Sequence, residues 1–118
     1  MKKERIILIK MVNYADRISS TIDRYELNYE KFINEDLFCD AISMCLLQIG
    51  ELANKLPKEL RQRYSTINWQ KIVSVRNRAA HGYDEMDFEV VWEIATKKIP
   101  ELKKYCKKIL EEIENVES

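Results

Sequence analysis

Glycine and proline are nearly absent from this sequence, with two of each among 118 residues. Because tight turns depend on these residues, their scarcity argues against a β-rich fold and favours long helices. Apolar residues make up 46% of the chain and charged residues 34%, the balance of a globular and not of a disordered protein. A chain of this length buries roughly two thirds of its unfolded surface as one domain. We therefore expect a single all-α domain over residues 1–118.

The sequence also lacks a long apolar run. The run near its start extends only from Ile6 to Ile9, whereas a membrane span needs about 20 apolar residues, and a signal peptide needs a longer core with a cleavage site. A cytoplasmic protein without a membrane partner is expected. The cysteines, Cys39, Cys45 and Cys106, are odd in number and lack Cys-x-x-Cys spacing. They are interpreted as free thiols in a reducing compartment.

The sequence contains a single histidine, His81. A histidine-rich metal site within one chain is therefore impossible, and the expected metal and cofactor content is none.

Apolar residues that recur every three or four positions predict four main helices. They cover about residues 2–25, 35–56 with Asn34 as N-cap, 69–80, and a last helix that starts within 84–89. A short basic helix opens at Pro57. The apolar period of the last helix continues through Pro100, which predicts one long helix kinked there. The expected architecture is an antiparallel four- to five-helix bundle.

The second predicted helix carries two adjacent apolar rows. One begins at Leu37 and includes Ala41 and Met44, and the other begins at Phe38 and includes Ile42. So wide a stripe predicts a helix that is packed on two sides, at the centre of the bundle.

The formal net charge is zero, but the charge is unevenly spread. Residues 55–81 hold seven lysines and arginines and only one acid, Glu59, a local charge of +6. This segment could meet an anionic partner, or it could simply be a solvated basic face.

Arg76 is placed by spacing on the apolar stripe that starts at Trp69. A guanidinium at such a position extends along the apolar surface to reach water, pairs with a carboxylate such as Glu51, or faces an anion in a groove. His81 follows five residues later and Gly82 suits a helix end, so His81 could cap the helix or take part in catalysis.

The string "RNRAAHGYD", residues 76–84, resembles the Arg-x4-His-x-Tyr motif of HepT-like toxins in the HEPN superfamily. The similarity extends over about residues 37–105, through "LQIGELANKLPKELRQRY", "INWQKIVSVRNRAAHGYDEMD" and "VWEIATKKIPELKKY". The resemblance implies a five-helix bundle that forms a homodimer, with two motifs facing one cleft.

The activity that the resemblance implies is metal-independent cleavage of RNA by an endoribonuclease toxin, in which the 2′-hydroxyl attacks the neighbouring phosphate. Arg76 and His81 match the catalytic pair, and Asn77 matches the supporting polar residue. Tyr83 matches the tyrosine to which a minimal nucleotidyltransferase antitoxin adds AMP. The candidate residues for binding the RNA are the basic ones near the motif: Arg61, Arg63, Lys71 and Arg78.

Two other functions stay open at this point. The chain could be a non-catalytic HEPN module that binds nucleotide or scaffolds a nucleotidyltransferase partner, and RNA would then survive incubation with it. It could also be a plain helical dimerisation domain, in which His81→Ala would matter only through stability.

Overall fold

The computed structural model describes the backbone of residues 2–80 and 87–117 and the side chains of residues 2–74 and 87–115. Within these ranges the chain is helical apart from short turns, and no described residue belongs to a strand. The all-α prediction is confirmed. The α-helices are α1 (Lys2–Arg24), α2 (Tyr29–Asn34), α3 (Asp36–Lys55), α4 (Lys58–Arg63), α5 (Trp69–Ala80), α6 (Phe88–Glu93) and α7 (Ile99–Glu117).

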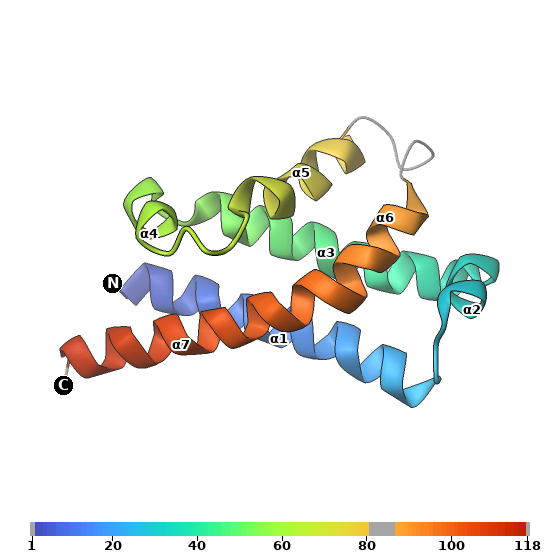
Figure 1. The fold of residues 1–118 in the computed structure, drawn as a ribbon, viewed down its shortest axis with the longest axis horizontal. Coiled ribbons are helices and arrows are strands. Elements are labelled where there is room, and N and C mark those ends of the chain that lie inside the picture. The colour runs from blue at the N-terminus through green and yellow to red at the C-terminus, as the bar shows by residue number, and fades with distance from the viewer. Residues whose placement is uncertain (1, 81–86, 118) are drawn as a thin grey trace.

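Helix α3 is the centre of the bundle. It packs against α1 on one side and against α5 on another, and α1 also packs against α7. The long helices run in alternating directions, so that α3 is antiparallel to both α1 and α5 (Figure 1). The predicted antiparallel bundle, and the packing of its second long helix on two sides, are therefore confirmed.

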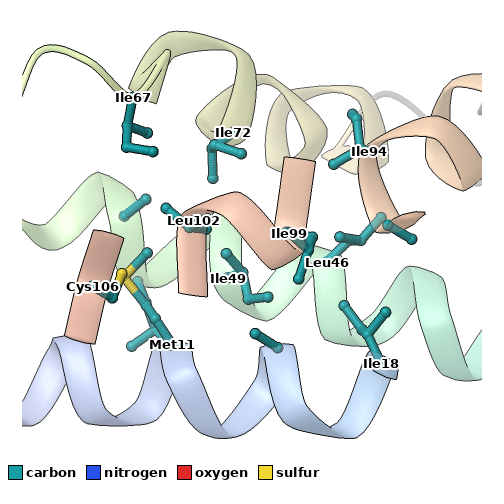
Figure 2. Packing of buried hydrophobic residues seen from close by; sticks show 14 of the residues in the cluster. Met11, Ile18, Leu46, Ile49, Ile67, Ile72, Ile94, Ile99, Leu102 and Cys106 are labelled. Carbon is teal, nitrogen blue, oxygen red and sulfur yellow. The ribbon is translucent and has the colours of Figure 1, made fainter. Parts of the chain in front are cut away.

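The core forms where α1, α3, α5 and α7 meet (Figure 2). Burial of each large apolar side chain stabilises the fold by about 1.5–3 kcal/mol relative to exposure. Because one cluster joins all four helices, the position of α5 is fixed by the same core that fixes α1 and α7. The labelled members are Met11, Ile18, Leu46, Ile49, Ile67, Ile72, Ile94, Ile99, Leu102 and Cys106.

A short helix, α2, occupies the segment between α1 and α3, where the sequence predicted only a connection. Its N-cap is Asn28, whose Oδ1 accepts a hydrogen bond from the Lys31 amide at 2.9 Å. Phe32 of α2 is completely buried. The prediction of Asn34 as the N-cap of the next helix is wrong, because this residue ends α2. The cap of α3 is Glu35, which makes no side-chain capping bond.

One apolar row of α3 remains on the surface. Ile42 of the second row is buried, whereas Leu37 is 69% exposed and Met44 is 57% exposed. Ala41, between them, is also exposed. The wide stripe therefore covers both the core and a strip of surface.

The last helix is continuous from Phe88 to Glu117 but contains one widened turn. A π turn, η2 (Ile94–Lys98), joins α6 to α7 just before Pro100. Proline has no amide hydrogen and its ring crowds the carbonyl four residues earlier, so a widened turn here relieves the conflict. The helix axis changes direction at this point (Figure 1), as predicted for a kink near Pro100.

Candidate functional site

Helix α5 carries the first half of the Arg-x4-His motif. Its start is set by Asn68, whose Oδ1 accepts a hydrogen bond from the Lys71 amide at 3.1 Å, a normal side-chain cap. Trp69 and Ile72 are buried and dock the helix on the core. The backbone of Arg76 and Asn77 lies in the C-terminal part of this helix.

The described residues stop short of the second half of the motif. His81 and Tyr83 lie in residues 81–86, outside the described residues, and so do the side chains of Arg76, Asn77 and Arg78. The structure therefore places the helix that carries Arg76.

Helix α6 resumes the described chain after the motif and is firmly anchored. Asp87 caps it by accepting hydrogen bonds from the amides of Glu89 and Val90 at 3.0 and 3.4 Å. The Phe32 ring of α2 lies 5.0 Å from Trp92 and 6.3 Å from Phe88, measured between ring centroids. The segment with His81 and Tyr83 is thus bounded on both sides by helices docked on the core.

A groove opens between α4 and the first half of α5. Its volume is about 590 Å³, and none of its lining residues is acidic. Lys58 and Arg61 line it from α4, together with polar amide and hydroxyl side chains and an apolar floor. The remaining lining residues are Gln62, Ser65, Ile67, Trp69, Gln70, Val73 and Ser74.

Among the basic residues near the motif whose side chains the structure describes, Arg61 and Lys71 do not line the same pocket. Arg61 lines the groove between α4 and α5, whereas Lys71 lines a smaller pocket of about 90 Å³ that also includes Lys98 and Glu101. Arg63 is exposed near the end of α4. The two pockets therefore lie on different flanks of α5, and only the pocket that Arg61 of α4 lines has no carboxylate in its lining.

Trp69, which lines the groove, is linked to α7 through Tyr64. The indole Nε1 of Trp69 donates a hydrogen bond to the Tyr64 carbonyl at 3.0 Å. The Tyr64 hydroxyl donates to the Glu112 carboxylate of α7, and its ring meets Tyr105 edge-on at 6.0 Å. The bond to Glu112 and partial burial raise the pKa of Tyr64, since both favour the protonated phenol.

The thiols are not candidates for a nucleophile. All three are free, as predicted, and Cys39 donates a hydrogen bond to the Phe32 carbonyl at 3.0 Å. Burial raises the pKa of Cys106 to about 12, which leaves almost no thiolate at neutral pH. In the described part of the chain, no three His, Cys, Asp or Glu side chains are gathered to hold a metal ion, and no helix is long and apolar enough to cross a membrane.

The sequence alone did not identify four of the residues that line the groove: Lys58, Gln62, Gln70 and Ser74. The only signal that pointed toward them was the +6 charge of residues 55–81. A charge count does not say which residues of two short helices face each other.

The fold is an all-α bundle of the HEPN kind, with the Arg-x4-His motif beginning at the end of α5. The model of the family described as "Ribonuclease HepT-like" matches residues 11–109. The chain belongs to this family.

Several relatives are similar over most of their length. "Putative RNase MJ1216" of Methanocaldococcus jannaschii is 36% identical over 93% of this chain and 89% of its own. "Putative RNase MJ0125" of the same organism is 34% identical over 93% of both chains. "Probable ribonuclease HepT" of Thermococcus cleftensis is 27% identical over 77% of this chain and 87% of its own. No solved structure matches the chain.

Proposed function

We propose that this protein is the endoribonuclease toxin of a toxin–antitoxin pair and cleaves RNA without a metal ion. The observation that carries the proposal is the family match over residues 11–109, which spans the Arg76–His81 motif. The names of the relatives, which describe ribonucleases, support RNA as the substrate.

The motif offers the groups that such a cleavage needs. The RNA 2′-oxygen forms a bond to the adjacent phosphorus while the bond from phosphorus to the 5′-oxygen breaks. One group must accept the 2′-hydroxyl proton and one must protonate the leaving 5′-oxygen. Histidine is the side-chain type whose ordinary pKa lies nearest neutral pH, so His81 would serve as the base or the acid. Arg76 offers planar, permanently charged donors to the phosphorane oxygens, and Asn77 supports it.

A homodimer would supply the second acid or base. Each chain has a single histidine, so a scheme with two histidines needs both motifs at one cleft. The exposed row of Leu37, Ala41 and Met44 on α3 is a surface that a second copy could cover. Because α3 is antiparallel to α5, this row lies on the half of α3 toward which the C-terminal end of α5 runs (Figure 1).

Regulation is proposed to act on Tyr83, two residues after His81. A minimal nucleotidyltransferase antitoxin would transfer AMP from ATP to the Tyr83 hydroxyl, which loses its proton, and pyrophosphate would leave. The adduct adds bulk and negative charge beside Arg76 and His81, so it would pair with the guanidinium and repel an incoming RNA phosphate. Mass spectrometry of the protein with and without this antitoxin and ATP would test the site, with Tyr83→Phe as the variant that gains no mass.

The basic residues Arg61, Arg63, Lys71 and Arg78 are proposed to attract the RNA. The positive charge near α4 and α5 supports this role. Such attraction is electrostatic, so RNA binding should weaken as the salt concentration rises.

The test is RNA cleavage by protein treated with chelator, after mass spectrometry shows that Tyr83 carries no adduct. We expect the wild type to cleave and His81→Ala to lose about 10² to 10⁴-fold in rate, the usual contribution of a positioned acid or base. Both proteins must give the same circular dichroism spectrum. Intact RNA with the folded wild type would instead favour the non-catalytic HEPN module that binds nucleotide or scaffolds a nucleotidyltransferase.

A further inference from the structure

The groove between α4 and α5 has the chemistry of a polyanion site. Lys58 and Arg61 supply two positive charges, and no carboxylate lines the groove. The Arg61 Nε is buried and has no hydrogen-bond partner among the described residues. A buried guanidinium nitrogen without a partner is costly. Because Arg61 also lines the groove, a phosphate in the groove could accept charge-assisted hydrogen bonds from its guanidinium.

The rest of the lining suits a nucleic acid strand better than an isolated anion. Amides of Gln62 and Gln70 and the hydroxyl of Ser65 line the groove, and each can both donate and accept hydrogen bonds. Trp69 lies in the floor and is only 6% exposed, so no broad aromatic face is offered for base stacking. The site therefore favours contacts to the sugar and phosphate of a strand over recognition of a stacked base.

The groove leads toward the motif. Helix α5 runs from α4 toward α6 (Figure 1), and the groove residues Gln70, Val73 and Ser74 lie on it. At about 1.5 Å per residue, position 76 lies roughly 9 Å along the axis from Gln70. Two or three stacked nucleotides at about 3.4 Å each cover that distance.

We propose that this groove holds the single-stranded RNA that flanks the scissile phosphate, with Lys58 and Arg61 paired to its phosphates. The inference rests on the proposed ribonuclease function and adds the path of the substrate to it. The strand follows the flank of α5 that faces Arg61 of α4, where the groove is lined by two cationic residues and by no carboxylate. Lys71 lies on the other flank, where Glu101 lines the same pocket, so Lys71 would add to the attraction of the RNA without lining the path of the strand.

The binding test uses the full chain with His81→Ala, so that the RNA stays intact, and a fluorescently labelled 12-nucleotide single-stranded RNA. The groove variant combines Lys58→Gln with Arg61→Gln. The control combines Lys104→Gln with Lys108→Gln, two exposed lysines of α7, and so removes the same charge. Anisotropy titrations at several salt concentrations give the dissociation constant and its salt dependence.

We expect the groove variant to weaken RNA binding at least tenfold. The slope of the logarithm of the association constant against the logarithm of the salt concentration should decrease in magnitude by about 1.4, the value for two lost phosphate contacts on a single strand. The control should weaken binding less than about threefold. Equal losses in the two variants, or no loss in the groove variant, would overturn the proposal. The proposal would also be overturned if the groove variant bound RNA normally but no longer bound the antitoxin. The groove would then be a protein-docking surface.

The two proposals fail separately in this design. If the folded wild type leaves RNA intact but the groove variant loses affinity, the ribonuclease function fails and the groove stands as an RNA-binding site. If the wild type cleaves RNA and the groove variant binds it normally, the groove proposal fails and the ribonuclease stands. In the active protein, the same double substitution should raise KM for long RNA.

Discussion

Met44→Glu should break the proposed dimer while leaving the protomer folded. The Met44 side chain is 57% exposed and that of Leu37 is 69% exposed on the same row of α3. Complete burial of such a side chain contributes about 1.5–3 kcal/mol. Scaled by the exposed fractions and counted in both protomers, these four side chains would contribute about 4–8 kcal/mol to association.

The loss expected from the single substitution follows from the same numbers. Removing Met44 from both protomers costs about 2–3 kcal/mol, which is a weakening of at least about 30-fold. The introduced carboxylates oppose association further, since burial of an unpaired charge is unfavourable. Glutamate is a good helix former, so the free energy of unfolding of the protomer should change little.

Sedimentation velocity over a range of protein concentrations measures this dissociation directly. The matched control is Ile6→Glu, which places the same charge at a 49% exposed apolar residue of α1 and should leave the dimer intact. The reasoning is refuted if Met44→Glu remains dimeric at the lowest concentration, or if Ile6→Glu dissociates equally. RNA cleavage should fall with the dimer, because the proposed scheme needs two copies of His81.

Three further experiments test the residues that support the site. Phe32→Ala should lower the free energy of unfolding by about 3–5 kcal/mol, measured by thermal melting, and Phe32→Leu should lose clearly less. Tyr64→Phe removes the hydroxyl that donates a hydrogen bond to Glu112. Because the pKa of Tyr64 is raised in the folded state, this bond stabilises the fold below pH about 10, and the stabilisation is lost as the pH rises further. The free energies of unfolding of the wild type and the variant should therefore converge at alkaline pH. Iodoacetamide at pH 8 should modify Cys45 well before Cys106, whose pKa is about 12; equally fast labelling of both in mass spectra would contradict the burial argument.

The long helices could be predicted because each buries a stripe several turns long. In α1, the buried residues Met11, Ala15 and Ile18 repeat at the helical period, and the stripe of α7 does the same. Helix α2 could not be found in this way. It has six residues and one buried side chain, Phe32, so it is too short to display a period.

The candidate site was predictable in its residue types but not in its layout. Arg61 and Lys71 both belong to the same basic segment of the sequence, yet they line different pockets. Arg61 is on α4, whereas Lys71 is on α5, and the flank that Lys71 occupies depends on the rotation of α5 about its axis. That rotation is set by tertiary contacts of Trp69 and Ile72, which local sequence does not encode.

The contacts that fix the rotation of α5 about its axis also link this helix, which carries Arg76, to α7. Arg76 follows Trp69 by seven residues, two turns of helix, so the two positions differ by only about 20° around the axis. The Trp69 indole is held by the Tyr64 carbonyl, and the Tyr64 hydroxyl is held by Glu112 of α7. These two bonds therefore help to hold the rotation at which α5 carries position 76. Because Trp69 also lines the groove, the same contacts would fix both the proposed RNA path and the position of the proposed catalytic arginine.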